Sequence, residues 1–121
     1  MKPPEMNRLL LDAIPALGEC YRETRDVWEG EEPDAHIVYG DCLGPALRLR
    51  LEGDAWDADE FVHVAFDLLE ALLQRNEDYA EGVVVTSVLD HLGGSPVRER
   101  AWARAGERTR QFLAEWRKWQ K

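Results

Sequence analysis

Three acidic residues close together in the sequence are the first candidates for chemistry. Asp54, Asp57 and Asp59 could bind a divalent cation through their carboxylates. However, the glycine and the terminal glutamate of a calcium-binding loop are absent. Asp57 and Asp59 are also explained by a helix N-terminus, where the cap and the first turn favour negative charge. We therefore expect no metal at these residues.

The three histidines are candidates for acid–base catalysis and metal binding. His63 and Asp67 are four residues apart and could form a general acid–base pair, or simply a surface hydrogen bond. His91 is expected to end a buried helix, where histidine often interacts with the last carbonyls. His36 lies beside Tyr39 with no nucleophile nearby in the sequence. Three histidines scattered in this way do not have metal-ligand spacing.

No residue pattern predicts nucleophilic catalysis. Cys20 and Cys42 have no histidine near them in the sequence, and Ser87 and Ser95 are expected inside a helix and at a helix cap. The glycines at 93–94 lack the rest of a phosphate-binding loop. We therefore predict that the protein is not an enzyme and has no cofactor. The alternative is an enzyme whose site is assembled from distant residues.

The two cysteines are too few for a disulfide framework. Reduced, partly buried thiols are expected, and a single Cys20–Cys42 bridge is the alternative. The first residues do not form the apolar run of a signal peptide, since Asp12 interrupts the leucines that precede it. No stretch approaches the roughly 18 apolar residues of a membrane span. The expected location is the cytoplasm.

The elements that must position these residues are helical. The 121 residues predict a single all-α domain, 1–121, in which residues 1–5 form a loose N-terminus. About six helices are expected, packed as antiparallel helical hairpins in a compact HEAT-like stack or bundle. Their apolar periodicity places them at 16–29, 42–52, 57–75, 79–92, 96–105 and 107–121, after a short amphipathic run at 5–13.

Three local features have specific expectations. Residues 36–40 could be a strand or a loop wall, and Asp41, Asp57 and Ser95 are expected to be helix N-caps. The valine-rich run 83–88 could be a strand, but the segment 79–92 is longer than a typical strand, so helix is preferred. The helix at 57–75 has one broad apolar face. Its solvated face is expected to contain Glu60, His63, Asp67, Glu70 and Gln74.

The charge of the chain is unevenly divided. Residues 1–95 contain 21 acidic and 7 basic residues, whereas residues 96–121 contain 3 acidic and 8 basic residues. An acidic body repels nucleic acid and anionic membranes and attracts basic partners. The basic C-terminal segment could contact nucleic acid, but we expect its arginines to fold back onto the acidic helices. No nucleic acid or membrane partner is therefore expected.

A basic protein partner is the expected ligand. The acidic residues predicted to contact it are those of two loops, with two aromatic residues as anchors. They are Glu29, Glu31, Glu32, Asp34, Asp54, Asp57, Asp59 and Glu60, with Tyr39 and Trp56 as the anchors.

Several short motifs occur in a distinctive order along residues 14–119. They are Ile14-Pro15-Ala16-Leu17, Trp28, the segment 36–45, Phe66-Asp67-Leu68-Leu69-Glu70, the segment 84–93, and Gly-Glu-Arg-Thr-Arg at 106–110 before the terminal tryptophans. This order resembles a bacterial family of helical domains that are similar to immunity proteins encoded beside polymorphic toxins. Gly44 and the pair Gly94-Ser95 depart from its pattern. The resemblance implies a compact helical domain without catalytic residues.

The sequence thus predicts an acidic binding protein, an immunity protein that neutralises a basic toxin domain by occlusion. The alternative is a small homo-oligomeric scaffolding protein whose interface uses Trp116 and Trp119 of the last helix. The identity of the partner, the binding face and the oligomeric state are left open by the sequence.

Overall fold

The described residues form only helices and connecting turns. The computed structural model describes residues 1–119, with side chains up to Glu115, and no strand occurs within this range. The α-helices are α1 (Pro3–Ala13), α2 (Gly18–Val27), α3 (Ala35–Val38), α4 (Gly44–Glu52), α5 (Glu60–Gln74), α6 (Asp78–Gly82), α7 (Val97–Arg104) and α8 (Glu107–Trp119). The predicted all-α fold is confirmed.

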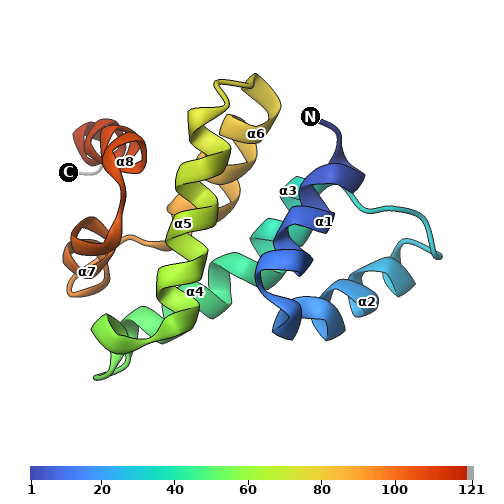
Figure 1. The fold of residues 1–121 in the computed structure, drawn as a ribbon, viewed down its shortest axis with the longest axis horizontal. Coiled ribbons are helices and arrows are strands. Elements are labelled where there is room, and N and C mark those ends of the chain that lie inside the picture. Colours follow the sequence, from blue (N-terminus) through green and yellow to red (C-terminus); the bar gives the residue numbers. More distant parts are fainter. Residues whose placement is uncertain (120–121) are drawn as a thin grey trace.

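Helix α5 is the centre of the assembly. It lies between α1 and α2 on one side and α7 and α8 on the other (Figure 1), and it packs against α1, α4, α6, α7 and α8. The apolar face predicted for this segment is the one that is buried. Its buried residues are Val62, Ala65, Phe66, Leu69, Leu72 and Leu73.

Two wide π-helical turns join the short helices into two longer rods: the α3 rod, residues 35–52, and the second rod, residues 78–91. The turn Tyr39–Leu43 joins α3 to α4, so the chain is helical from Ala35 to Glu52. The expectation of a strand or loop wall at 36–40 is therefore wrong, and Asp41 lies inside the rod rather than at its start. Asp34 is the N-cap, since its Oδ1 accepts a hydrogen bond of 2.9 Å from the amide of His36. A π turn tolerates the missing amide proton of Pro45 because its hydrogen bonds are already displaced.

The second π turn, Val83–Val88, continues α6 and leads into a 3₁₀ turn at Leu89–His91. The preference for a buried helix over a strand at this valine-rich run is therefore confirmed. The two π turns pack against each other. The approach is close at Gly40, where a Cβ atom would lie 3.6 Å from the Cβ of Ser87.

Two other helix starts differ from those expected. A 3₁₀ turn, Trp56–Ala58, precedes α5, and the N-cap of α5 is Asp59 rather than Asp57, because its Oδ1 accepts a 2.9 Å hydrogen bond from the amide of Phe61. Ser95 is not the N-cap of α7. Its peptide bond to Pro96 is cis, and its hydroxyl donates to Glu99 instead of accepting from a backbone amide.

Residues 3–5, expected to belong to a loose N-terminal segment, form the first turn of α1, which begins at Pro3. The amino group of Met1 forms an ion pair with Glu77. This pair lowers the pKa of Glu77 through its hydrogen bond, helped by a second hydrogen bond from Arg75.

Glu70 links α5 to α8. It was expected on the solvated face, but its carboxylate accepts hydrogen bonds from the amides of Arg108 and Thr109, at 3.0 and 2.9 Å, and from the Thr109 hydroxyl at 2.8 Å. Glu70 therefore caps the N-terminus of α8 from another helix. Burial alone would raise the pKa of Glu70, but these bonds and one from Gln74 outweigh it and lower the pKa.

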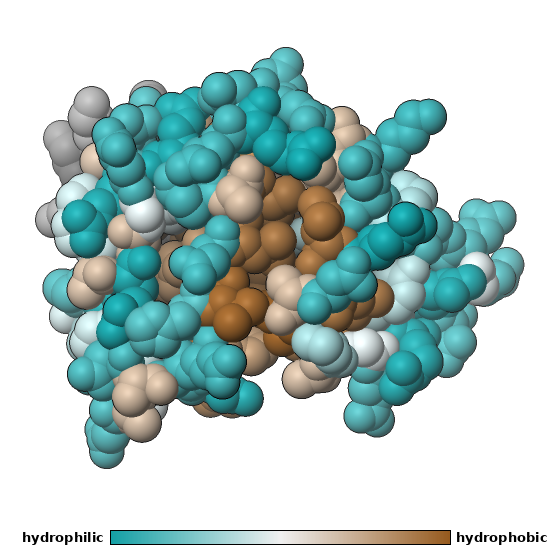
Figure 2. Space-filling model, in the orientation of Figure 1, coloured by the Kyte–Doolittle hydropathy of each residue, from teal (hydrophilic) through white to brown (hydrophobic). Residues whose placement is uncertain are grey.

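The surface has one apolar patch on the face shown in Figure 2. It lies between α1 and α5. Half-buried apolar residues such as Leu9, Val64 and Leu68 pack against the core from these two helices. Among the described residues, no helix is both long and apolar enough to cross a membrane.

Gly44 tests how tightly the rods are packed. A Cβ atom at Gly44 would lie 2.3 Å from Cδ2 of His91, so Gly44→Ala must displace the ring from its site. Over-packing of this kind costs about 1–3 kcal/mol. We expect Gly44→Ala to lower the free energy of unfolding in urea by that amount. Gly18→Ala is the control, since its Cβ would meet only Arg22 at 3.5 Å. Equal stability of the two variants would contradict this close packing.

The Glu70 cap predicts a pH dependence of stability. Because its pKa is lower in the folded protein than the ordinary value of 4.5, its contribution is fully present above pH 4.5. It is lost as the pH falls through the folded-state pKa. We expect Glu70→Gln to cost about 1 kcal/mol at pH 7, and the difference from wild type to shrink below pH 4.5. Denaturant titrations at several pH values measure this, and a difference that grows on acidification would contradict it.

Candidate functional site

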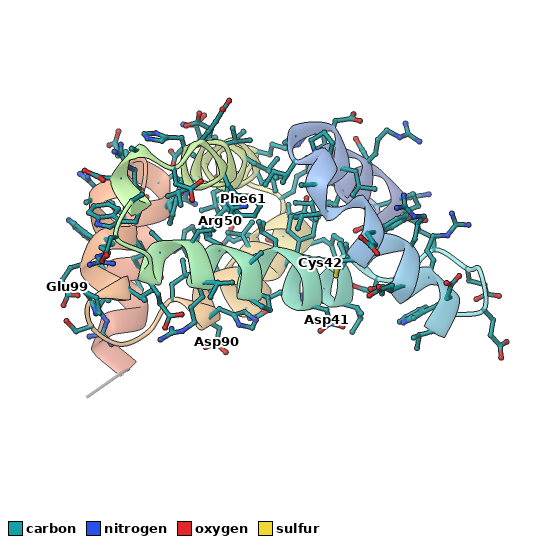
Figure 3. All side chains as sticks on the ribbon, turned by 90° about the horizontal axis from the view of Figure 1, so that it is seen from below. Asp41, Cys42, Arg50, Phe61, Asp90 and Glu99 are labelled. Carbon is teal, nitrogen blue, oxygen red and sulfur yellow. A yellow bond between two sulfur atoms is a disulfide. The ribbon has the colours of Figure 1, made fainter. Side chains whose placement is uncertain are left out.

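The residues predicted to contact a partner fall into two groups at opposite ends of the molecule. The loop 29–34 follows α2 at one end, and the loop 54–60 joins α4 to α5 at the other (Figure 1). In Figure 3, Cys42 and Asp41 mark the α2 end, whereas Arg50 and Phe61 lie near α7. The two groups therefore do not form one continuous surface.

The 54–60 group is accompanied by arginines of the same chain. Asp59 accepts two hydrogen bonds of 3.1 Å from Nη1 of Arg50. Trp56 is half-buried, and the guanidinium carbons of Arg100 and Arg104 lie 5.6 and 6.0 Å from its ring centroid. The negative charge of this loop is therefore partly neutralised within the chain.

Two arginines of the basic C-terminal segment, Arg100 and Arg104, fold back onto the end of α4 and the loop after it, where they bond backbone carbonyls. Arg100 donates to the carbonyl of Leu51 at 2.7 Å, and Arg104 donates to the carbonyl of Asp57. Asp54, Asp57 and Glu60 have exposed side chains. His63 also bonds the Asp57 carbonyl, at 3.1 Å, and not the carboxylate of Asp67. The acid–base pair considered from the sequence is therefore not formed.

In the 29–34 group, the carboxylates of Glu32 and Asp34 form hydrogen bonds within the chain. Glu32 accepts hydrogen bonds from Asn7 at 3.0 Å and from the hydroxyl of Tyr21, and burial together with this bond raises the pKa of Tyr21 to about 12. Asp34 accepts a 2.7 Å hydrogen bond from the hydroxyl of Tyr79, and burial with this bond raises the pKa of Tyr79 to about 12. These two carboxylates attach the loop to its neighbours.

Glu29 and Glu31 are the two members of this group that face solvent. Glu29 has a φ of 56° and Gly30 a φ of 83°, so the chain reverses directly after α2 and presents both carboxylates outward. Tyr39, predicted as an aromatic anchor, is fully buried and donates a 2.7 Å hydrogen bond to the carbonyl of Met6. That prediction is wrong, because the π turn directs this side chain into the core.

A groove between α2 and the α3 rod is the feature that the sequence analysis missed. It is lined by Cys20, Glu23, Thr24, Val27, Trp28, Ile37 and Asp41 and has a volume of about 250 Å³. Val27 is 81% exposed, Trp28 39% and Ile37 37%. The sequence contained one signal for this groove: the apolar pair Val27-Trp28 lies at the end of a short, highly charged helix, and Val27 does not belong to the predicted apolar face of that helix.

Two carboxylates, those of Glu23 and Asp41, line this groove, and Glu19 and Asp26 lie on the neighbouring surface of α2 together with Arg22 and Arg25. Residues 18–34 contain seven acidic residues and two arginines. We call the exposed carboxylates of α2 and its following turn, together with Asp41, the acidic face. They are Glu19, Glu23, Asp26, Glu29, Glu31 and Asp41. Among the described residues, none of the ion pairs involves a carboxylate of this face.

A disulfide between Cys20 and Cys42 lies at the base of the groove. The expectation of reduced thiols is therefore wrong, and the alternative of a single bridge is correct. The bond fixes α2 to the π turn Tyr39–Leu43. This attachment matters because α2 has no buried residue of its own to hold it against the core.

One polar cluster combines residues that are distant in the sequence. Nδ1 of His36 and Oγ of Ser87 share a hydrogen bond of 3.0 Å where the rods meet, and the ring of His36 packs edge-on against Tyr79. Asp34 bonds Tyr79 and the backbone of His36 but not the imidazole. Ser87 is buried, so this pair lacks the exposed nucleophile that acyl transfer needs.

Other ligand chemistry has little support in the part of the chain that is described. Within it, no three His, Cys, Asp or Glu side chains are grouped so that they could hold a metal ion. Trp116 and Trp119, on which the scaffolding alternative depends, lie outside the residues whose side chains are described.

Comparison of the chain with protein-family models, with curated proteins and with solved structures finds no match. The resemblance to the immunity-protein family therefore stays a prediction.

The disulfide predicts that α2 is the element most sensitive to reduction. We expect the Cys20→Ser, Cys42→Ser double variant to be less stable by about 2–4 kcal/mol, because the unfolded chain loses its cross-link. Hydrogen exchange at residues 18–27 should accelerate under native conditions by far more than at residues 60–74 of α5. Treatment of wild type with a dithiol reductant should have the same effect. Unchanged protection of α2 in both experiments would contradict the prediction.

Proposed function

We propose that this chain is an acidic binding protein that neutralises a basic protein domain by covering its active surface. The partner class expected from the resemblance is a toxin domain that acts on nucleic acid or nucleotides. Such a domain must present cationic side chains to hold its anionic substrate. A protein that occupies those side chains excludes the substrate without any chemistry of its own.

The observation that carries this proposal is the acidic face. Its carboxylates are exposed and have no ion-pair partner among the described residues. Unpaired carboxylates of one sign repel each other, which costs stability. That cost is recovered when a cationic surface docks, and the shared field also steers the two proteins together before contact.

The 54–60 loop is the weaker candidate for the same role. Arg50, Arg100 and Arg104 already contact this loop, so it offers a basic partner less net attraction. Their presence would also repel the cationic residues of a partner. We therefore assign the contact to the α2 end and not to both ends.

Anionic ligands fit the acidic face poorly. A nucleic acid strand approaching it would meet unpaired carboxylates, and binding of phosphates depends on released counterions and cationic side chains. The basic residues of α7 and α8 are partly engaged: Arg100 and Arg104 bind carbonyls, and Arg110 donates to the carbonyl of Trp102 at 2.9 Å.

Charge reversal tests the proposal. We expect Glu23→Lys with Asp26→Lys to weaken protection when the chain is co-expressed with the toxin domain that it neutralises. The cause is slower association, about tenfold or more at low salt. The toxin is found by co-expression of the chain with a panel of toxin domains that have cationic active sites, and association rates are then measured at increasing salt.

The matched control is Asp57→Lys with Glu60→Lys, which reverses two exposed charges at the other end of the molecule. This control should retain protection and the wild-type association rate to within about twofold. Equal losses in both double variants would show that only net charge matters. Protection that is insensitive to both variants and to salt would contradict an electrostatic mechanism.

A further inference from the structure

We propose that the groove between α2 and the α3 rod receives one apolar side chain of the basic partner, while lysine or arginine residues on either side of it meet the acidic face. This inference rests on the proposed function, since it names what the same partner must present. The expected ligand is a segment in which an apolar residue is flanked by cationic residues.

The groove has the dimensions of a side-chain site. Its volume of about 250 Å³ is below the range of about 300–1,000 Å³ that encloses a small-molecule ligand. It is also open, because its walls are two helix surfaces and a turn. One wall is Val27 and Trp28 at the end of α2, and the other is Ile37 of α3.

The apolar walls are unusually exposed for this chain. Among the described residues, four large apolar side chains are more than a third exposed, and three of them, Val27, Trp28 and Ile37, line this one groove. Clustered exposed apolar residues with a polar rim are typical of interaction sites. Tryptophan is also among the residues enriched at the energetic centre of interfaces.

The charges around the groove select the class of partner. Glu23 lies on the α2 wall and Asp41 on the opposite wall, so both sides of a docked apolar side chain face a carboxylate. Glu19 and Asp26 lie on the neighbouring surface of α2 beside Arg22 and Arg25, and Glu29 and Glu31 are exposed around the turn after the helix. Cationic residues on both sides of the apolar one complement this arrangement.

A second copy of this chain fits the groove less well than a basic partner. A two-fold dimer through this surface would place the acidic face of one protomer against the same face of the other. Like charges opposed in this way destabilise an interface. A heterologous basic partner does not have this penalty.

The Cys20–Cys42 bond pre-forms the groove. Because it joins the two helices that supply the two walls, the distance between them is fixed before the partner arrives. A pre-organised site loses less conformational entropy on binding than a flexible one. The shape of the groove is therefore a property of the free protein.

A pair of peptides tests the inference without the natural partner. The probe is a lysine-rich peptide with one central leucine, and its control is the same peptide with glycine at the centre. Affinities for the whole oxidised protein are measured by fluorescence anisotropy. We expect the leucine peptide to bind about five- to tenfold more tightly, because the groove removes its side chain from water.

Single variants test whether the preference for the leucine peptide comes from the groove. Trp28→Ala and Ile37→Ala should each reduce the ratio of the two affinities to about one while both peptides still bind. Leu49→Ala is the matched control, because Leu49 is 70% exposed but lies outside the groove, and it should keep the full ratio. Circular dichroism verifies that each variant is folded. If Trp28→Ala is not, Ile37→Ala alone decides.

The outcomes separate the two proposals. Equal affinity of wild type for both peptides, with binding that weakens in salt, would overturn the groove inference and leave the proposed function standing. Absence of binding by either peptide at low salt would overturn both. A wild-type dimer in analytical ultracentrifugation that Ile37→Ala dissociates would also overturn the inference, because the occupant would then be a second copy.

Discussion

Burial of the broad apolar face of α5 is the interaction on which the other helices depend. Six residues of this face are buried, and helices from both halves of the sequence pack against α5. Each buried side chain of this size contributes about 1.5–3 kcal/mol relative to an exposed one. A helix as short as α7 is not stable alone. It therefore exists because α4 and α5 provide a surface for it to cover.

Polar groups then fix what apolar packing leaves undetermined. Glu70 sets the start of α8, and Arg48 donates to the carbonyls of His91 and Gly93, at 2.7 and 2.8 Å, where the second rod ends. Both side chains act on the terminus of another element, so they define how two helices meet. Arg100 and Arg104 do the same for the turn after α4. In this half of the molecule, charged side chains hold helices and turns in position relative to one another.

The α2 half uses charge differently. Helix α2 has no buried residue, and its position follows from a covalent bond and from the Tyr21–Glu32 contact. The carboxylates of α2 are exposed and form no ion pair among the described residues, so they are available to a partner. The contrast between the two ends supports the assignment of binding to one of them.

Much of the fold could be predicted from the sequence, because helical periodicity is a local property. The end of α5 and its buried face follow from residues 57–75 alone, although the helix begins at Glu60 and not at Asp57. The length of segment 79–92 resolves the ambiguity of its valines. The π turn at 39–43 could not be predicted in this way. Gly40 within it and the pair Gly44-Pro45 directly after it resemble a break between elements, whereas packing against the second rod keeps it helical.

The candidate site was harder to predict because it depends on pairs that are distant in the sequence. Nothing in the spacing of Cys20 and Cys42 indicates a bond, and only the fold brings Asp34 to Tyr79. The sequence showed the acidic composition, but it did not show which carboxylates form hydrogen bonds or ion pairs within the chain. The anchor proposed at Tyr39 failed for the same reason, since burial is decided by neighbours and not by residue type.

The two π turns have a consequence for how the chain could change in length. A π turn accommodates one residue more than an α-helix that spans the same rise. Loss of one residue inside α5 would rotate everything after it by about 100° and carry its apolar face away from the core. Loss of one residue from 39–43 or 83–88 would instead restore an ordinary helix with both flanks still in phase. Within the rods, these are the places where the fold can absorb deletions.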